Sequence, residues 1–344
     1  MLRKNILITL VLLFCLSLSA QEKKLNIAIV AFYNVENFYD TIDDPKTDDA
    51  EFLPGGSQGW NSAKYNLKLD RISEVISKIG QEVVPGGPVV IGLSEIENRM
   101  VLEDLVNTET LKSKNYGIVQ YNSPDRRGVD VALLYQKSRF TLEGSKPFPL
   151  KTADTSLRTR DQLLVWGKLD GEEIYFLVNH WPSRRGGEQR SAPKRKDAAL
   201  LARHITDSLL SKNPNTKLII MGDLNDNPNN ASISKHLNAK GKIEVLTSSD
   251  LYNPMFKLYK DGVGSYAYRD SWDLYDQMIV SYPLTGNDHN SYKLMKAKIF
   301  NEQFLKQKTG TFTGYPWRTA AGGQYIMGYS DHFPVYGILG RDAK

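Results

Sequence analysis

The sequence is almost without cysteine. Its single cysteine, Cys15, lies in an N-terminal segment that we expect to be removed, so the mature chain would have no disulfide, thiolate metal site or cysteine nucleophile. Histidine is also scarce, with five in 344 residues. Because closed zinc sites prefer sulfur and nitrogen ligands, the composition argues against such a site.

Long hydrophobic runs are lacking as well, apart from one at the N-terminus. Residues 6–18 are apolar, follow the basic pair Arg3 and Lys4, and precede Ser19-Ala20-Gln21. This order of charged start, apolar middle and small-residue exit is typical of a secretory signal peptide. The run is shorter than the roughly 18 to 20 residues of a membrane span. We therefore expect no stable membrane anchor from this segment.

A lipid anchor at Cys15 is disfavoured too, because the preceding residues, Leu13-Phe14, are not the small residues that such a site needs. We expect signal-peptide cleavage near Ala20 and a secreted or periplasmic protein. The remaining residues, 21–344, suit one large α/β domain, and we expect a monomer.

Neither sign of charge is in large excess. The formal net charge is +5, and it falls to about +3 without Arg3 and Lys4, too little to require a polyanionic partner. A local basic run follows His180, and its members are Arg184, Arg185, Arg190, Lys194, Arg195 and Lys196. The run is either a solvated loop and helix start or a surface for substrate phosphates, with Arg184 and Arg185 as the candidate contacts.

Several short apolar runs adjoin polar or charged residues, which predicts buried strands. These runs are residues 27–33, 89–93, 129–135, 163–169, 174–178, 218–221 and 277–280. Helical periodicity appears between some of them, at residues 65–79 and 196–210. Other neighbouring runs leave no room for a helix, which favours mixed sheets, packed on each other with helices outside. Residues 40–61 and 261–270 are rich in turn formers and predict surface loops.

Acidic and amide residues stand at the ends of the predicted strands: Glu95, Asp223, Asn225 and Asp331. A hard cation such as Mg²⁺ takes oxygen ligands of this kind, usually with only one or two carboxylates. Asp223 and Asn225 are two residues apart, so in an extended backbone their side chains point the same way, one to activate water and the other to position it. The same residues would also suit a turn that ends the strand.

The segment Ser330-Asp331-His332 precedes an apolar run at residues 333–339. A His332 held protonated by a buried carboxylate would stabilise the charge that develops on a pentavalent phosphorus. Asp276 is the candidate for that carboxylate. Taken alone, each of these residues would also fit a capping aspartate or a core histidine.

Four further polar residues adjoin predicted strands. His180 could donate a proton to a leaving alkoxide or bind a phosphate oxygen, and Asn179 beside it is a candidate substrate contact. Arg160 could offer a planar guanidinium to phosphate. Asn34 could help to place the metal-bound group. The alternatives are a loop histidine and a surface arginine.

Taken in chain order, these motifs resemble the endonuclease/exonuclease/phosphatase superfamily over about residues 27–339. The motifs are Asn34, Ser94-Glu95, Arg160, Asn179-His180, Gly222-Asp223-Leu224-Asn225, Asp276 and Ser330-Asp331-His332. The resemblance implies a deoxyribonuclease I-like four-layer α/β sandwich, in which two mixed β-sheets pack face to face with helices outside. It also implies hydrolysis of phosphoester bonds with a divalent metal, Mg²⁺ or alternatively Mn²⁺ or Ca²⁺.

The resemblance implies a role for each metal or water ligand. Glu95 looks like the principal metal ligand, assisted by Asn34 and Asp331. Asp223 would orient and deprotonate the attacking water, and Asn225 would hold that water or the phosphate.

It implies roles for the histidines in the same way. His332, supported by Asp276, would contact the scissile phosphate. His180 resembles the histidine that the deoxyribonuclease I branch places near the leaving group, with Asp130 as its acidic partner.

The sequence also departs from part of the superfamily. The apurinic endonucleases carry a tyrosine where this chain has His180 and an asparagine where it has Ser183, which disfavours abasic-site repair. Residues 32–40 and 315–318 look like an exported bacterial branch.

Three functions follow from these observations. The first is a metal-dependent nuclease that binds DNA or RNA as its substrate. The second is a phosphatase or phosphodiesterase for a lipid headgroup, as in sphingomyelinases, or for an inositol or small-metabolite phosphate, which would need the same centre with a different rim. The third is a non-catalytic binding protein, which the complete set of acidic and histidine residues disfavours.

Overall fold

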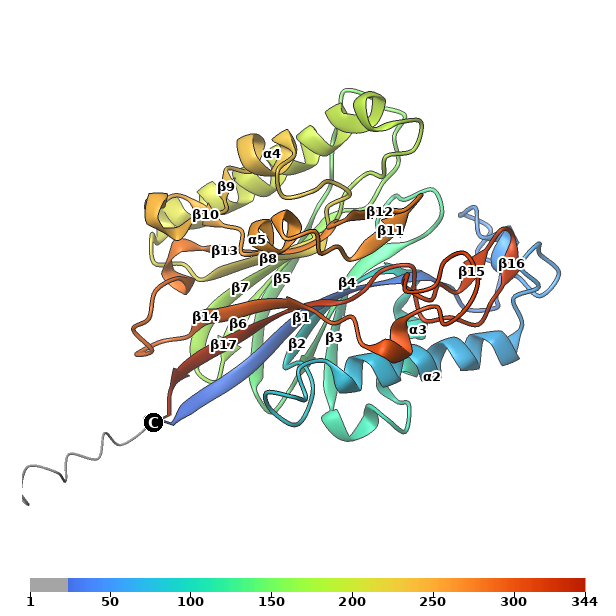
Figure 1. The fold of residues 1–344 in the computed structure, drawn as a ribbon, viewed down its shortest axis with the longest axis horizontal. Helices are drawn as coiled ribbons and strands as arrows, with labels where there is room; N and C mark the ends of the chain where they lie inside the picture. Colours follow the sequence, from blue (N-terminus) through green and yellow to red (C-terminus); the bar gives the residue numbers. More distant parts are fainter. Residues whose placement is uncertain (1–23, 344) are drawn as a thin grey trace, which may run out of the picture.

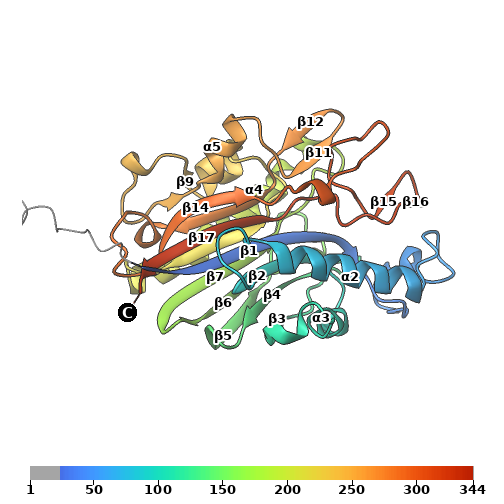
Figure 2. The ribbon, with the colours of Figure 1, turned by 60° about the horizontal axis from the view of Figure 1, so that its bottom comes forward.

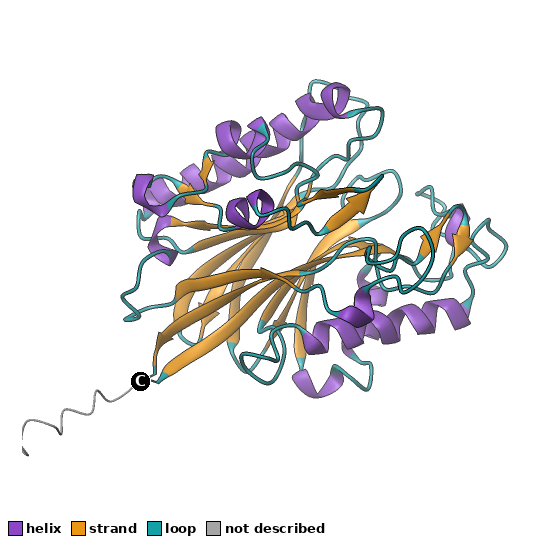
Figure 3. Ribbon diagram, viewed as in Figure 1, coloured by secondary structure: helices purple, strands orange, loops and turns teal. Residues whose placement is uncertain are grey.

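The computed structural model describes residues 24–343, so the predicted signal peptide, residues 1–20, lies outside the described residues. Two large β-sheets pack face to face, and helices cover their outer faces (Figures 1 and 3). The expected four-layer arrangement of mixed sheets is therefore confirmed. Within residues 24–343, no helix combines the length and the apolar character needed to cross a membrane.

The first sheet has six strands in the order β14-β17-β1-β2-β4-β3. Its strands are β1 (Leu25–Phe38), β2 (Val90–Ile96), β3 (Tyr116–Gln120), β4 (Asp130–Gln136), β14 (Lys293–Ile299) and β17 (Val335–Asp342). The central pair β1 and β2 is parallel, and the other neighbours are antiparallel. The outer face is covered by α2 (Ser62–Lys78) and α3 (Arg99–Val106).

The second sheet has seven strands in the order β5-β6-β7-β8-β13-β10-β9. Its strands are β5 (Phe140–Phe148), β6 (Gln162–Leu169), β7 (Glu172–His180), β8 (Leu218–Asp223), β9 (Ala239–Lys240), β10 (Leu251–Tyr252) and β13 (Asp276–Ser281). Its central pair, β7 and β8, is again parallel. Helix α4 (Glu188–Lys212) covers the outer face, and the short helix α5 (Met255–Lys260) lies near β13.

The alternating side chains of the strands build separate cores. In β1, every second residue faces the other sheet while the residues between them face α2 and α3, because successive side chains of a strand point to opposite faces. The inward set is Ala28, Val30 and Phe32, and the outward set is Ile29, Ala31 and Tyr33. All six are fully buried. Because both faces of β1 are apolar and buried, the strand lies in the middle of the molecule.

Two local irregularities interrupt the central strands of the first sheet. The pairing of β1 with β2 shifts register between Asn34 and Phe38, and the pairing of β2 with β4 shifts at Glu95. Glu95 has a φ of 63° and Glu36 a φ of 51°, in the left-handed region. Such bulges re-aim side chains at the ends of sheets. Asn34 therefore lies at a bulge within β1, not at the end of the strand as the sequence suggested.

One prediction about local structure was wrong, and one predicted helix begins earlier than its periodicity indicated. Residues 261–270, expected to be a loop, contain β11 (Tyr266–Tyr268), which pairs with β12 (Ser271–Asp273) in a hairpin. Helix α4 begins at Glu188, so the basic run after Arg185 is mostly helical. A second hairpin joins β15 (Ala320–Ala321) and β16 (Gln324–Tyr325).

Candidate active site

One end of the sandwich gathers the polar residues, because of how the strands run. Strand β2 of the first sheet ends there just after Glu95, and strand β8 of the second sheet ends there at Asp223. Strand β13, antiparallel to β8, starts there with Asp276. Asp276 lies directly opposite Asp223 in the register of these two strands. The carboxyl ends of β2 and β8 and the amino end of β13 thus lie at the same end of the sandwich.

Glu95 is held in its ionised form at the β2 bulge. Its Oε2 accepts the backbone N–H of Asn37 at 2.9 Å, and its Oε1 lies 3.7 Å from Nη2 of Arg127. Burial alone would raise the pKa of Glu95, but Arg127 and the Asn37 N–H outweigh it and hold the pKa below its usual value. An ionised, positioned carboxylate of this kind is suited to a hard cation.

Asp223 is bound on both oxygens. Nδ2 of Asn34 donates to its Oδ2 at 3.1 Å, and the backbone N–H of Asn225 donates to its Oδ1 at 2.9 Å. Burial, together with the charges of Asp276 and Glu95, raises the pKa of Asp223 to about 7, although His332 acts in the opposite direction. Asp223 is therefore a fixed carboxylate with a proton affinity suited to a general base near neutral pH.

Asn225 is not placed as the sequence suggested. Strand β8 ends at Asp223, and Asn225 has a φ of 50°, so the extended geometry that would align the two side chains does not exist. The Asn225 side chain instead donates from Nδ2 to the carbonyl of Trp181 at 3.0 Å. Asn225 is instead linked to Asp223 by its backbone N–H, which donates a hydrogen bond to the Asp223 carboxylate.

His332 and Asp276 are brought together as a buried pair. Nδ1 of His332 lies 2.6 Å from Oδ2 of Asp276, which also accepts the hydroxyl of Ser265 at 2.6 Å. Burial alone would lower the pKa of His332, but the charges of Asp276, Asp331 and Asp223 raise it well above its ordinary value. His332 is therefore protonated and can direct a charged Nε2–H into the site.

His180 faces the same centre without a charge. Its Nε2 lies 3.6 Å from Oδ2 of Asp223 and 3.8 Å from Oε1 of Glu95. Burial and the neighbouring arginines Arg160 and Arg127 lower the pKa of His180 well below its usual value. A neutral imidazole suits the binding of a phosphate oxygen better than proton donation to a leaving group.

Asp130 does not support His180. Its carboxylate accepts hydrogen bonds from Ser123 and Gln120, while Nδ1 of His180 has no hydrogen-bond partner among the described residues. The predicted pairing of Asp130 with His180 is therefore corrected. Burial raises the pKa of Asp130 to about 7.

Three predicted substrate contacts are already engaged inside the protein. Asn179 is fully buried, donates to the carbonyl of Leu177 and accepts the indole N–H of Trp181, which leaves it no face for substrate. Arg160 is buried and donates to Asp125 at 3.0 Å and to the carbonyl of Trp181 at 2.8 Å. These two residues brace the site, and their predicted substrate contact is corrected.

The third engaged residue is Arg184. It donates to the backbone carbonyl of Asn225 at 3.0 Å and to Asp226 at 3.2 Å, and pairs with Glu188 at 3.0 Å. Its role in the structure is to hold the turn after Asp223. Arg185, by contrast, is exposed, so its contact with substrate remains a prediction.

Asp331, the remaining predicted metal ligand, lies at the open side of the site. Its Oδ1 is 3.8 Å from Nε2 of His332, and its Oδ2 is 3.9 Å from Nη2 of Arg318. The sequence had not marked Arg318 or Arg127 as site residues, because each lies in a loop with no strand signal. Together the two guanidiniums flank the carboxylates.

Two buried charged residues beneath the site, Glu36 and Lys68, were also missed. Glu36 accepts the backbone N–H of Thr319 at 2.6 Å, and burial and the charge of Asp331 raise the pKa of Glu36 to about 7. Lys68 of α2, completely buried, donates to the hydroxyl of Thr319 at 2.5 Å and to the carbonyl of Tyr329 at 2.7 Å. Burial lowers the pKa of Lys68 to about 8. The only signal was the position of Glu36 two residues after Asn34.

The residues present fit a divalent cation. Several carboxylates share one buried region, where burial first and neighbouring carboxylates second raise the pKa values of Asp223 and Glu36, and a cation there would favour their ionised forms. Among residues 24–343, no three acidic or histidine side chains are gathered tightly enough to enclose a metal by themselves.

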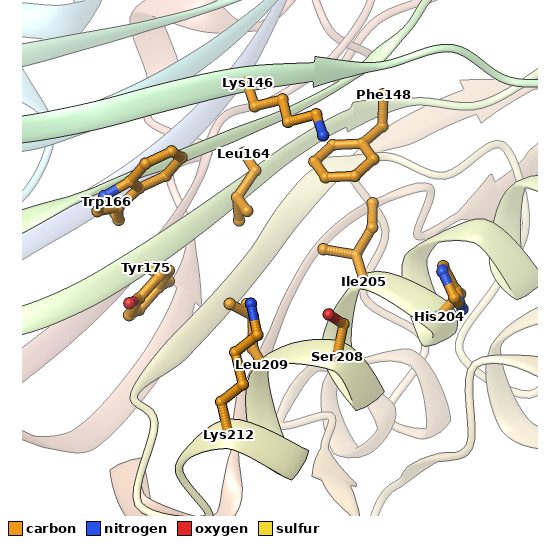
Figure 4. A pocket seen from close by; sticks show the side chains of 10 residues that line it. All are labelled: Lys146, Phe148, Leu164, Trp166, Tyr175, His204, Ile205, Ser208, Leu209 and Lys212. Carbon is orange, nitrogen blue, oxygen red and sulfur yellow. The ribbon is translucent and has the colours of Figure 1, made fainter.

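A groove of about 360 Å³ lies elsewhere, between α4 and the outer face of β5–β7 (Figure 4). Its apolar walls include Phe148, Trp166 and Tyr175, and it contains none of the residues described above. It is therefore separate from the candidate active site.

Comparison with known proteins supplies the class. Residues 29–341 match the model of the Endonuclease/Exonuclease/phosphatase family, and the chain belongs to this family. Members of this family are phosphoester hydrolases, so the chain belongs to a class of phosphoesterases. No curated protein matches the chain.

Solved structures agree on the fold. A Danio rerio TDP2 in complex with a single-strand DNA product has a TM-score of 0.55 at 13% identity, covering 91% of this chain and 99% of that one. A mannosyl-6-phosphatase from Bacteroides thetaiotaomicron has a TM-score of 0.53 at 16% identity, with coverage of 91% and 99%. A further family protein from Bacteroides thetaiotaomicron has a TM-score of 0.53 at 18% identity, with coverage of 93% and 97%.

Proposed function

We propose that the protein is a secreted, divalent-metal-dependent nuclease that hydrolyses phosphodiester bonds of DNA or RNA by attack of water. The observation that carries the proposal is the convergence of a fixed carboxylate and two differently charged imidazoles. Oδ2 of Asp223 lies 3.6 Å from Nε2 of the neutral His180 and 3.9 Å from Nε2 of the protonated His332. A phosphate bound beside this cluster would have a base for the attacking water and a charged hydrogen-bond donor within reach.

Each of these side chains has a definite task in hydrolysis. Asp223, oriented by Asn34, accepts the proton of the attacking water as the new phosphorus–oxygen bond forms. His332 donates from Nε2 to a non-bridging oxygen, while Asp276 holds Nδ1 and keeps the ring charged. The bond to the leaving oxygen breaks, and that oxygen takes a proton from solvent.

Glu95, Asp331 and Asn34 are the residues that would hold the metal. Bound Mg²⁺ or Mn²⁺ would polarise the phosphate and neutralise charge on it. The buried Glu36 and Lys68 would keep the surrounding backbone in place, and Arg127 would keep Glu95 ionised.

The Danio rerio TDP2 neighbour, with its single-strand DNA product, supports a nucleic-acid substrate by analogy of fold. A sugar-phosphate monoesterase is the second candidate. The engagement of Arg184 inside the protein removes one expected contact to a polymer, and Arg127 and Arg318 flank the site in a way that suits a dianionic phosphate.

The test is hydrolysis by the purified chain without residues 1–20. Substrates are plasmid DNA, single-stranded DNA, RNA, bis-p-nitrophenyl phosphate and mannose 6-phosphate, each with Mg²⁺, Mn²⁺, Ca²⁺ or EDTA. We expect metal-dependent cleavage of nucleic acid and of the small diester. Undiminished activity in EDTA would contradict the metal mechanism, and hydrolysis of the monoester alone would favour the second candidate.

A further inference from the structure

A two-stranded hairpin stands directly beside the proposed catalytic histidine. Tyr266, the first residue of β11, forms an isolated antiparallel bridge with His332, and their ring centroids are 4.9 Å apart. Tyr266 also stacks on Tyr275, with centroids 5.4 Å apart. The hairpin projects from the same end of the sandwich as the β15–β16 hairpin (Figure 2). The β11–β12 hairpin therefore starts beside the proposed catalytic histidine and extends away from it.

One face of this hairpin carries two aromatic rings, those of Tyr266 and Tyr268. Because side chains of a strand alternate between faces, Tyr266 and Tyr268 share the face that starts at His332, and Ala267 takes the other. Tyr268 is 52% exposed, an unusual degree for a large aromatic residue. The turn residues Arg269 and Asp270 have φ values of 49° and 60°, which allow a tight two-residue turn.

The opposite face fixes the hairpin to the body of the protein. Trp272 stacks on Phe333, with centroids 6.0 Å apart, and meets Tyr315 edge-on at 5.7 Å. The hydroxyl of Tyr315 donates to Oδ1 of Asp270 at 2.6 Å and accepts its backbone N–H at 2.8 Å. Since the tip is clamped, Tyr268 is held in place before any ligand arrives, which lowers the entropic cost of binding.

Cationic groups accompany the rings. The guanidinium of Arg269 lies 5.1 Å from the ring centroid of Tyr268. Arg318, whose charge acts on Tyr266, lies 3.9 Å from Asp331. Proteins that bind single-stranded nucleic acid combine these two elements, aromatic rings on which bases stack and cations that follow the phosphates.

We propose that the face formed by Tyr266 and Tyr268 binds an unpaired base next to the scissile phosphate, so that the preferred substrate is single-stranded nucleic acid. The inference rests on the proposed nuclease function. A base in a duplex already stacks on its neighbours, and exposing it costs a few kcal/mol, so the rings favour strands whose bases are free.

The experiment compares Tyr268→Ala, Tyr268→Phe and the control Tyr282→Ala. Tyr282 is similarly exposed, at 42%, but follows β13 at the end of that strand remote from Asp276. The kinetic substrates are a single-stranded oligonucleotide, the same oligonucleotide in a duplex, mannose 6-phosphate and bis-p-nitrophenyl phosphate. Binding of a fluorescent single strand in EDTA is measured in parallel.

Loss of one stacked base corresponds to about a 5- to 150-fold effect. We therefore expect Tyr268→Ala to lower kcat/KM for the single strand by that factor relative to the small diester, chiefly through KM. Tyr268→Phe should retain most of the wild-type ratio, because it keeps the ring, and Tyr282→Ala should match wild type. Binding in EDTA should weaken in the same order.

Three results would overturn the inference: equal loss on the oligonucleotide and the small diester, equal cleavage of single strand and duplex by wild type, or a Tyr268 dependence seen only with mannose 6-phosphate. Failure of the nuclease function looks different, because wild type would then hydrolyse no nucleic acid with any metal. The small diester and the EDTA binding measurement separate the two cases.

Discussion

At the scale of single residues, Asp223 is central to the proposed reaction, because Asn34, Asn225 and both histidines bind it or lie close to it. Asn34 and the Asn225 backbone fix its two oxygens, and both histidines lie within 4 Å of Oδ2. Its pKa of about 7 is raised chiefly by burial. The site therefore uses the protein interior to make an ordinary aspartate more basic.

Asp223→Asn removes the proton acceptor while keeping the shape of the side chain. We expect kcat for bis-p-nitrophenyl phosphate to fall by about 100- to 10,000-fold, the usual contribution of a general base. Circular dichroism should show an unchanged fold. The control Asp261→Asn alters an exposed aspartate on the surface and should behave as wild type. Wild-type turnover by Asp223→Asn would exclude the assigned role.

Asp276→Asn addresses the charge on His332. The raised pKa of His332 means that its ion pair stabilises the fold fully below pH 6.5 and that this contribution is lost as the pH rises through the higher folded-state pKa. Removing the Asp276 charge should lower the pKa of His332, so that His332 loses its proton at a lower pH.

This change is measured by the NMR titration of His332 in the metal-free protein, and by the alkaline limb of the pH–rate profile. Both should move toward lower pH in Asp276→Asn. The Asp261→Asn control should leave both unchanged. An identical His332 titration in wild type and Asp276→Asn would show that Asp276 does not set the charge.

Residues at the site differ in how far the sequence could predict them. Asp276 and His332 were recognisable because each adjoins an apolar strand and their chemistry is complementary. Asn179 and Arg184 were misplaced, since a polar residue beside a catalytic histidine gives no sign of whether its side chain turns toward substrate or toward the protein. Lys68 was invisible, because a lysine in an amphipathic helix normally faces solvent.

At the scale of elements, helix α2 and the segment with β15–β16 are joined through Lys68. The ammonium group binds Thr319 and the Tyr329 carbonyl, and it is the only buried lysine in α2. Glu36 of the β1 bulge binds the backbone of the same Thr319. A helix, a bulge and a hairpin segment are thus fixed against one another just beneath Asp331.

Lys68→Met should disrupt this connection. Methionine would remove both buried hydrogen bonds of the ammonium group and leave the Thr319 hydroxyl and the Tyr329 carbonyl without this donor, so we expect a loss of about 3 kcal/mol in the free energy of unfolding by urea. Backbone amides of residues 319–329 should exchange hydrogen faster. The double variant Lys68→Met with Glu36→Gln should recover part of the loss, because it removes both charges.

The matched control is Lys78→Met on the same helix. Lys78 forms an exposed pair with Glu74 four residues away, worth at most about 0.5 kcal/mol. Equal destabilisation by the two lysine variants would contradict the special role of Lys68.

The sequence predicted most elements but not the irregularities that aim the site. Strands such as β1 and β8 were evident from their apolar runs, and α2 from its periodicity. The bulge at Glu95 and the left-handed Asn225 were not, because non-glycine residues with positive φ depend on the surrounding structure. The β11–β12 hairpin was read as a loop because its turn formers outweighed the short Tyr266-Ala267-Tyr268 alternation.

At the scale of the whole molecule, glycines of one sheet meet methionines of the other. A Cβ at Gly92 of β2 would lie 2.8 Å from Sδ of Met221, and a Cβ at Gly337 of β17 would lie 2.5 Å from Sδ of Met278. Met221 and Met278 are themselves opposite each other in strands β8 and β13. The closest approach of the two sheets is therefore set by missing side chains on one of them.

Gly92→Ala tests this packing. The added methyl group cannot fit without displacing Met221 or Val178, so we expect a loss of about 1 to 3 kcal/mol in unfolding free energy. Gly55→Ala is the control, because a Cβ there would meet nothing within 4 Å. A loss no larger than that of the control would mean that the sheets can separate at little cost.

The buried methionines also make the packing between the two sheets sensitive to oxidation. Met221 and Met278 are fully enclosed between the sheets, so peroxide can reach their sulfur atoms only when the sandwich opens. A sulfoxide formed there would be bulkier and polar, and it could not return to its place against Gly92 or Gly337. A single oxidative event during a transient opening of the molecule would thus leave a lasting defect in the packing, two residues away from Asp223, until the sulfoxide is reduced.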